Sequence, residues 1–174
     1  MNEEITFVNF RKEQGLELIE LWRKSFAHAM GIKEDTREEV VNEHLAYLQT
    51  YNPEIIRVAV ESNNKIVGFM AKEENTIKDL FIHVEYQRRG LGSRFINQAK
   101  AEEEFLTLST FQLNKGAQQF YEFHDFKIAR VGFAGVEGNG WANNKEQLAD
   151  ITYEWKRVTK KLQSKKNYSQ TLAL

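Results

Sequence analysis

Residues 83–99 read HVEYQRRGLGSRFINQA and mark the place where the pattern of the chain changes. An apolar run precedes the stretch, and Leu91 and Phe95 begin a repeat at the spacing of one helix face. Gly90 and Gly92 stand at the junction beside a run of arginines. A strand, a glycine turn and a helix in this order offer free backbone N–H groups to an anion. The stretch therefore predicts either a phosphate-binding turn or a turn that only starts a helix.

The regions on either side of this stretch predict a mixed α/β sheet. Upstream we expect a strand in 4–10, an amphipathic helix in 18–29 and a second helix opened by a capping box of Thr36 and Glu39. Three antiparallel strands follow, over 56–60, 66–71 and from Ile77 onward. Downstream we expect a helix from Leu91, a strand in 105–110, a helix in 114–123 and strands in 126–136 and 148–155. This order makes a βαβ crossover.

Length and composition limit the class of protein. A chain of 174 residues fits one domain, which we expect to span 1–158, with a polar tail in 159–174. The net charge of −1 gives no global attraction for nucleic acid or an acidic membrane surface, and no apolar run approaches the length of a membrane span. The absence of cysteine excludes disulfides and thiolate metal sites. We expect a cytoplasmic protein without nucleic-acid or membrane partners.

Two familiar phosphate-binding loops do not fit the glycine turn. The dinucleotide fingerprint needs a third glycine where Phe95 stands. The P-loop needs Gly-Lys-Ser/Thr after its spacer, and the chain has no such sequence.

A second motif in the same half of the chain narrows the interpretation. Residues 87–92, QRRGLG, resemble the Q/R-x-x-G-x-G/A loop of the GNAT superfamily of N-acetyltransferases. The segment NKGAQQFYE resembles that family's N-x-x-A-x-x-F-Y-E motif through Asn114, Ala117, Phe120, Tyr121 and Glu122. The resemblance implies an α+β fold with a mixed, mostly antiparallel sheet of about six to seven strands and about four helices. It also implies that the sheet is splayed between its fourth and fifth strands.

The resemblance further implies that acetyl-CoA, as co-substrate and without a metal, lies in this gap. Its pyrophosphate would rest on the backbone amides of Arg88, Arg89, Gly90, Leu91, Gly92 and Ser93. Independently of the resemblance, the side chains of Arg88, Arg89 and Arg94 are expected either to add charge at the turn or to be solvated. Its pantetheine would pair with the main chain of Phe81, Ile82 and Val84. Asn114 is expected to cap its helix, to contact the coenzyme, or both. The family often has proline where Val84 stands and glycine where Asp125 stands, and Asp125 then implies either a left-handed backbone or a different turn.

The chemistry of acetyl transfer from a thioester to an amine assigns further roles. Tyr121 matches the family's proton donor to the leaving sulfur, and the N–H of Ile82 is a candidate for the oxyanion. The general base stays open, because the places where the family carries one hold residues that are poor bases at neutral pH. Those residues are Thr76, Lys78 and Ser109, and the alternatives are Glu73, Glu74 and Asp79 through water, or His83 and His28.

The acceptor is expected to be a primary amine of a small cationic molecule or a peptide. Acidic residues gather before and within the second helix, namely Glu34, Asp35, Glu38, Glu39 and Glu43. They predict either an attractive surface for a cation or an ordinary solvated helix face. The loop around Trp141 is expected to cover the acceptor, to form a hairpin connection or to make a dimer contact. A different class of function, a non-catalytic acyl-CoA sensor, is favoured by the missing base, and a homodimer is compatible with the sequence.

Overall fold

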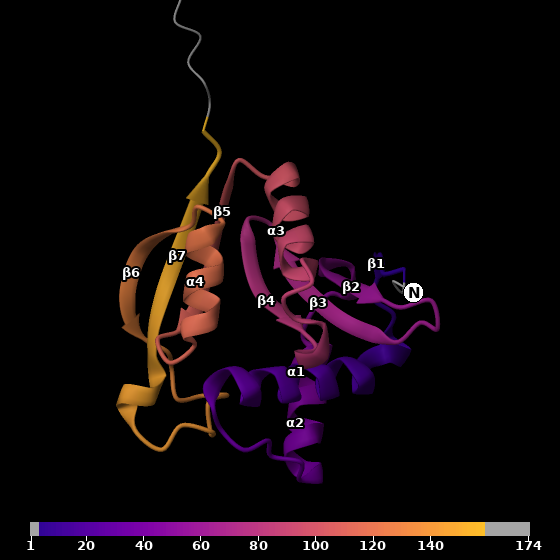
Figure 1. Cartoon of the computed structure of the whole chain (residues 1–174). Coiled ribbons are helices and arrows are strands. Elements are labelled where there is room, and N and C mark those ends of the chain that lie inside the picture. Colours follow the sequence, from indigo (N-terminus) through magenta and orange to yellow (C-terminus); the bar gives the residue numbers. More distant parts are fainter. Residues whose placement is uncertain (1–3, 159–174) are drawn as a thin grey trace, which may run out of the picture.

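The computed structural model of the chain describes residues 4–158 (Figure 1). Within them, seven strands form one mixed sheet in the order β1-β2-β3-β4-β5-β7-β6. The strands are β1 Thr6–Asn9, β2 Ile56–Val60, β3 Ile66–Glu73, β4 Thr76–Ile82, β5 Phe105–Phe111, β6 Lys127–Phe133 and β7 Ala149–Lys156. The α-helices are α1 Gly15–Met30, α2 Glu38–Gln49, α3 Leu91–Glu102 and α4 Lys115–Phe123. The predicted mixed sheet with four helices is confirmed, and the predicted tail lies outside the described residues.

The sheet consists of two antiparallel halves that barely touch. Strands β1 to β4 form one half and β5, β7 and β6 the other. Their parallel junction has a single register pair, Thr76 with Thr107, supported by a 2.9 Å bond from the Thr107 N–H to the Asn75 carbonyl. From there β4 and β5 diverge, as Figure 1 shows. The predicted splay between the fourth and fifth strands is therefore confirmed.

Two hydrophobic cores hold the helices to the sheet. Phe95, Ile96 and Ala99 of α3 are fully buried in one core, which extends to Tyr121 on α4. Leu18 and Ile19 of α1 belong to the other core, which Leu48 of α2 joins. Helices α1 and α2 therefore cover a different part of the sheet from α3 and α4, and the two pairs flank the gap. None of the helices in residues 4–158 is long and apolar enough to span a membrane.

A β-bulge in β4 determines what faces α2. Asp79 pairs with Ala71, but Ile77 pairs with the next residue of β3, so Lys78 is an extra residue in β4. A bulge bends its strand and redirects its side chains. Ile77 consequently packs in the core beside α3, whereas Lys78 and Asp79 both contact Tyr51, which follows α2.

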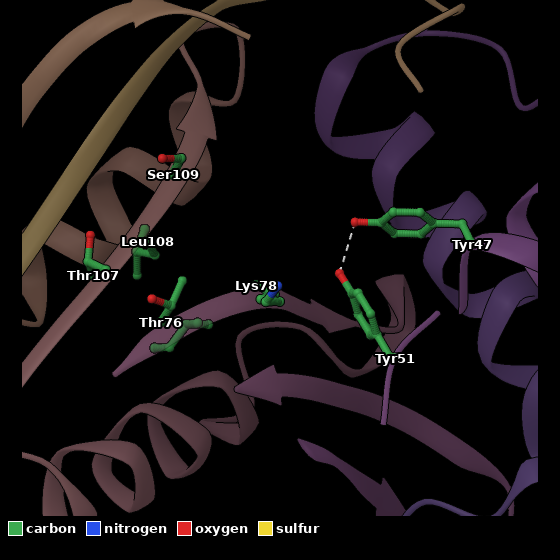
Figure 2. A pocket seen from close by; sticks show the side chains of 8 residues that line it. Tyr47, Tyr51, Thr76, Lys78, Thr107, Leu108 and Ser109 are labelled. Carbon is green, nitrogen blue, oxygen red and sulfur yellow. Dashed lines mark hydrogen bonds between the residues drawn. The ribbon is translucent and has the colours of Figure 1, made fainter. Parts of the chain in front are cut away.

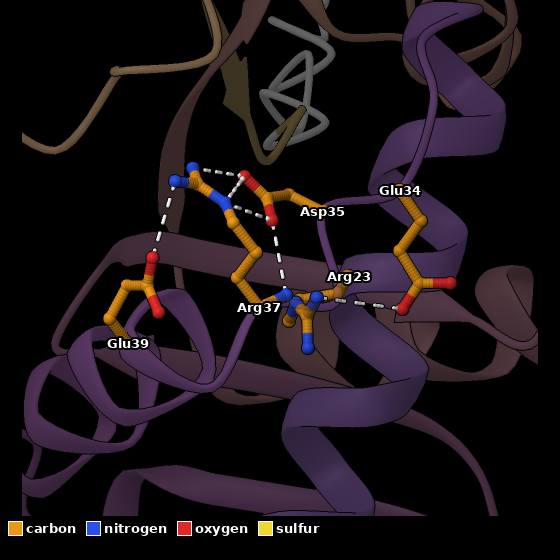
Figure 3. A network of polar contacts seen from close by, with 5 residues as sticks. All are labelled: Arg23, Glu34, Asp35, Arg37 and Glu39. Atoms are coloured by element: carbon orange, nitrogen blue, oxygen red, sulfur yellow. Dashed lines mark hydrogen bonds and ion pairs between the residues drawn. The ribbon is translucent and has the colours of Figure 1, made fainter.

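The start of α2 differs from the prediction. Thr36 is not its capping residue, because the helix begins at Glu38 and Arg37 is the N-cap, without a side-chain capping bond. Asp35 fixes this start by accepting from the Arg37 backbone N–H at 3.1 Å and pairing with its guanidinium at 2.6 Å (Figure 3). Arg37 also reaches Glu39 at 3.3 Å. The predicted capping box of Thr36 and Glu39 is therefore wrong, because the Glu39 carboxylate pairs with Arg37 instead.

The other predicted elements are confirmed with shifted ends. The first helix is longer than predicted and ends at Met30. Gly31 follows it as a left-handed C-cap with a φ of 65°. The strand predicted over 126–136 ends at Phe133.

The contact between β3 and β4 beside the gap gives a first prediction. A Cβ added at Gly68 would lie 2.7 Å from Ile82 Cδ1 and 3.2 Å from the Phe81 carbonyl oxygen. Gly68→Ala should lower the free energy of unfolding by about 1–3 kcal/mol in urea denaturation, because overpacking displaces backbone as well as side chain. Gly135→Ala is the matched control, since nothing lies within 4 Å of its added Cβ, and an equal loss there would contradict the argument.

Candidate active site

Gly90 opens α3 in a conformation suited to an anion. It is the N-cap of α3 with a φ of 84°, and a Cβ there would meet nothing within 4 Å. The helical ladder begins with the Arg94 N–H bonding to the Gly90 carbonyl at 3.0 Å. The backbone N–H groups of 91–93 precede that bond, and the first turn of a helix leaves such donors without an intrahelical acceptor. The turn thus offers open space and convergent donors, which suits a phosphate.

Gly92 is a glycine for a different reason. A Cβ at this position would lie 3.0 Å from the ring of Phe120 on α4. The next residue, Ser93, also contacts α4. Its Oγ is 2.9 Å from Nε2 of His124, the C-cap residue of α4. Gly92 therefore lets the start of α3 pack directly against α4, whereas Gly90 provides the left-handed backbone and the open space at the turn.

The arginines near the turn have distinct surroundings. Arg88 adopts a left-handed φ of 62°, and the Arg89 guanidinium lies 4.8 Å from the centre of the Tyr86 ring. Arg94 instead stacks on Phe7 at 4.2 Å and bonds to the Ile5 carbonyl at 3.3 Å. The expectation that Arg94 adds charge at the turn is therefore corrected, because its guanidinium is held at β1.

The turn at each end of α4 matches its prediction. Asn114 is the N-cap, and its side-chain oxygen accepts from the Ala117 N–H at 3.0 Å. The amide nitrogen of Asn114 is then the group left for a coenzyme contact. Asp125 has a φ of 63°, so the left-handed alternative for this residue is the correct one.

The alternation of β4 decides which backbone groups face the gap. The His83 N–H donates to the Val67 carbonyl of β3 at 2.9 Å. Phe81, two residues before His83, pairs with Phe69 of β3 and has the same backbone orientation as His83. Phe81 therefore directs its main-chain groups to β3, which corrects its predicted pairing with pantetheine. Ile82 faces the other way: its carbonyl accepts from Ser25 Oγ at 3.0 Å and its N–H points to the gap.

The remaining predicted backbone contact lies just beyond β4. Val84 starts a short 3-10 helix, Val84–Tyr86, instead of continuing the strand. Leu80 has the same orientation as Ile82 by alternation, so its N–H also faces the gap, one step closer to the junction of the halves.

Tyr121 is buried on α4 among aromatic rings. Its ring contacts Phe126 at 5.8 Å and Tyr153 at 6.1 Å between centroids. Burial raises the pKa of the phenol well above its usual range, and the nearby Asp79 carboxylate raises it further. Tyr121 is consequently a neutral hydrogen-bond donor at all physiological pH values.

A cavity of about 320 Å³ lies where β4 and β5 begin to diverge. It is lined by Tyr47, Tyr51, Thr76, Ile77, Lys78, Thr107, Leu108 and Ser109. Figure 2 shows the two tyrosines entering from the α2 side, opposite Ser109 on β5. The three positions where the family pattern expects a base, Thr76, Lys78 and Ser109, are thus brought together in one cavity.

Two of those side chains are already engaged. Lys78 Nζ lies 2.8 Å from the Glu73 carboxylate, and this hydrogen bond raises the pKa of Lys78, which stays protonated. Ser109 Oγ is 3.0 Å from Thr152 Oγ1. Neither group is a base in this arrangement, and Glu73 is the ion-pair partner of Lys78.

Tyr47 and Tyr51 are not among the residues predicted from the sequence, and they form a chain of hydroxyls leading out of the cavity. Tyr51 OH donates to Asp79 Oδ2 at 2.7 Å, and Tyr47 OH lies 3.0 Å from Tyr51 OH. Burial raises the pKa of Asp79, more than Tyr51 and Lys78 lower it. The available signal was the pair of tyrosines four residues apart, although Tyr51 lies just beyond α2, which ends at Gln49.

The histidine candidates lie elsewhere. The ring of His83 accepts from the Glu85 N–H at 3.3 Å, and burial lowers its pKa. His28 is exposed on α1. Neither lines the cavity between β4 and β5.

The acidic residues near α2 are partly neutralised. Asp35 and Glu39 pair with Arg37, and Glu34 lies 3.8 Å from the buried Arg23 (Figure 3). Glu43 stands one helical turn before Tyr47, on the side of α2 that reaches the cavity.

The loop that carries Trp141 spans the wide end of the gap. The Trp141 ring lies 5.5 Å from Phe26 of α1 and 5.1 Å from Phe111 at the end of β5. Trp141 therefore joins the two sides of the gap through ring contacts.

Comparison with known proteins finds a family model that matches the part of the chain around the gap. A model described as an acetyltransferase (GNAT) domain matches residues 53–128, which contain the β4 bulge, the glycine turn and Tyr121. Residues 53–128 thus match a GNAT acetyltransferase domain. This match supports an N-acetyltransferase that depends on acetyl-CoA.

One relative and two solved structures are similar to the chain. The peptidyl-lysine N-acetyltransferase YjaB of Salmonella typhimurium is 28% identical over 123 residues, which are 68% of this chain and 80% of that protein. The solution structure of apo YjaB from Escherichia coli matches with a TM-score of 0.65 and 22% identity, over 87% and 97% of the two chains. The PaiA N-acetyltransferase of Thermoplasma acidophilum, solved with coenzyme A, matches with a TM-score of 0.60 and 18% identity, over 88% and 99%. These two structures share the fold.

The raised pKa of Asp79 predicts how the stability of the protein depends on pH. Its pKa in the folded protein is above the ordinary value of 3.8, so ionisation of Asp79 costs the folded state stability as pH rises. Asp79→Asn should therefore raise the melting temperature at pH 8, and the gain should shrink as pH falls and wild-type Asp79 takes up its proton. Asp35→Asn is the opposing control, because Arg37 lowers the pKa of Asp35 to about 2. A gain of the same sign for both variants would contradict this account.

Proposed function

We propose that the chain transfers the acetyl group of acetyl-CoA to the primary amine of a cationic acceptor, a small molecule or a peptide. The observation that carries the proposal is the cavity at the β4–β5 junction, lined by hydroxyls and reached from the α2 side. Its position supports an acceptor site at the narrow end of the gap. The name of the Salmonella typhimurium relative, a peptidyl-lysine N-acetyltransferase, favours a lysine side chain as the acceptor.

The proposed coenzyme site follows the gap from the glycine turn to the bulge. The pyrophosphate rests on the amides from Arg88 to Ser93, where the open space at Gly90 admits it. Asn114 offers its amide nitrogen from α4. The main chain of Ile82 and Val84 borders the pantetheine arm, since Ile82 turns its N–H away from β3.

Three residues of the gap serve the transfer itself. The N–H of Ile82, with that of Leu80 one step closer to the cavity, stabilises the charge that develops on the thioester oxygen. Tyr121 donates a hydrogen bond to the departing sulfur. Because the phenol pKa is raised, complete proton transfer to a thiolate of pKa about 8.5 is uphill, and hydrogen bonding is the step that Tyr121 supplies.

The acceptor amine needs a base, because an alkylammonium of pKa about 10 is almost entirely charged at pH 7. Among the sequence candidates, Asp79 is joined to the cavity through the hydroxyl of Tyr51. Glu73 is paired with Lys78. Asp79 is therefore the base that this arrangement favours.

Tyr121→Phe tests the enzyme against the sensor alternative. The variant should retain acetyl-CoA binding and lose roughly 10- to 100-fold in kcat, the worth of one hydrogen bond to a charged group. Thiol release with a panel of amines gives kcat, and calorimetry gives binding.

Tyr153→Phe is the matched control, because it removes a buried tyrosine hydroxyl that bonds to Glu122 at 2.9 Å outside the cavity. Tight acetyl-CoA binding by the wild type, with no thiol release for any amine, would instead support a sensor.

Glu43→Gln tests the charge of the acceptor. Glu43 lies one turn from Tyr47 and acts on Arg37 only through its charge, whereas Glu39 pairs with Arg37 directly. Loss of the Glu43 charge should raise KM for a linear polyamine by a few-fold and leave kcat unchanged. The effect should fade at 0.5 M salt, since exposed charges are screened. Glu39→Gln, whose carboxylate is held by Arg37, provides the comparison, and an equal rise in KM there would argue against a specific cation path.

A further inference from the structure

We propose that Tyr51 is a catalytic proton relay between the acceptor amine and Asp79, an inference that rests on the proposed acetyl transfer. Tyr51 lines the cavity, and its hydroxyl is hydrogen-bonded to the Asp79 carboxylate at 2.7 Å. Asp79 itself is outside the set of residues that line the cavity. A proton leaving the cavity for Asp79 therefore passes through the hydroxyl of Tyr51.

The hydrogen-bond directions are fixed by the carboxylate. An ionised Asp79 only accepts, so the Tyr51 proton points to it. Tyr47 OH, 3.0 Å away, must then donate to the Tyr51 oxygen. A phenol oxygen accepts two bonds, so one lone pair of Tyr51 is left for the cavity. Figure 2 shows this hydroxyl pair at the α2 side of the cavity.

The transfer balances as a pair of coupled proton shifts. The N–H bond of the acceptor ammonium breaks as an O–H bond forms on Tyr51. The original Tyr51 proton moves at the same time to Asp79, so Tyr51 stays a neutral phenol and the neutral amine attacks the thioester. Between turnovers Asp79 returns its proton through Tyr51 and Tyr47, whose side chain is exposed to solvent.

The surroundings of Asp79 suit an acceptor of protons. On its own strand, Asp79 is next to Lys78, which is paired with Glu73. From the α2 side it faces Tyr51, which is hydrogen-bonded to Tyr47, and from α4 it faces Tyr121. The Lys78 and Glu73 charges offset each other, so burial dominates and Asp79 is a stronger base than a solvated carboxylate. The β4 bulge is what sets Asp79 next to Tyr51.

The test is the pH profile of kcat/KM for Tyr51→Phe, with a lysine-containing peptide and a linear polyamine as acceptors. At pH 7 the variant should be roughly 100-fold slower, the usual worth of a positioned base. The deficit should vanish near pH 10, where the amine is largely neutral without help. Asp79→Asn should show the same profile, and the double variant should be no slower than either single variant, because the two groups act as a unit.

Tyr153→Phe is again the matched control, and it should keep the wild-type shape of the profile because its Glu122 bond lies outside the cavity. Calorimetry with acetyl-CoA and a melting curve verify that each variant is folded. A deficit in Tyr51→Phe that is constant from pH 7 to pH 10 would indicate a structural hydroxyl and overturn the relay alone. Acetyl-CoA binding by the wild type without acetylation of either acceptor would overturn the proposed function and the relay together.

Discussion

The single register pair between Thr76 and Thr107 is the constraint on which the rest of the site depends. Two strands that pair along their whole length leave no room between them, whereas strands joined at one point must diverge. The bulge at Lys78 lies immediately beyond that point and turns two consecutive side chains toward α2. The gap, the cavity and the position of Asp79 are therefore consequences of one local break in regular pairing.

Burial and function oppose each other at Asp79. A partly buried carboxylate is a cost to the folded state, and a neutral side chain of the same shape would remove that cost. The same burial makes the carboxylate a better acceptor of protons. An aspartate at this position therefore lowers the stability of the folded protein but suits a site that must accept a proton.

The features that the sequence predicted well are those encoded by neighbouring residues. The glycine turn, the helix that starts at Leu91 and the cap at Asn114 are local, and the two motifs implied the splay through family resemblance. The prediction that the second helix starts at Thr36 was wrong, because its N-cap is Arg37. Arginine is not a usual capping residue, and Asp35 holds it in place. Tyr47 and Tyr51 were missed because their partner Asp79 is 28 residues away from Tyr51 and is brought there only by the bulge. The direction of Arg94 likewise depends on β1, far away in the chain.

The ring contacts of Trp141 give the protein a built-in optical reporter. Trp141 lies between Phe26 and Phe111 at the wide end of the gap, whereas Trp22 packs against Phe81 beside α1. Trp155 lies under Lys100 at the far end of β7. Of the three indoles in the chain, Trp141 is thus the one in ring contact with both α1 and the end of β5. Its fluorescence, isolated by replacing the other two with phenylalanine, should therefore respond to a change in the distance between the two half-sheets.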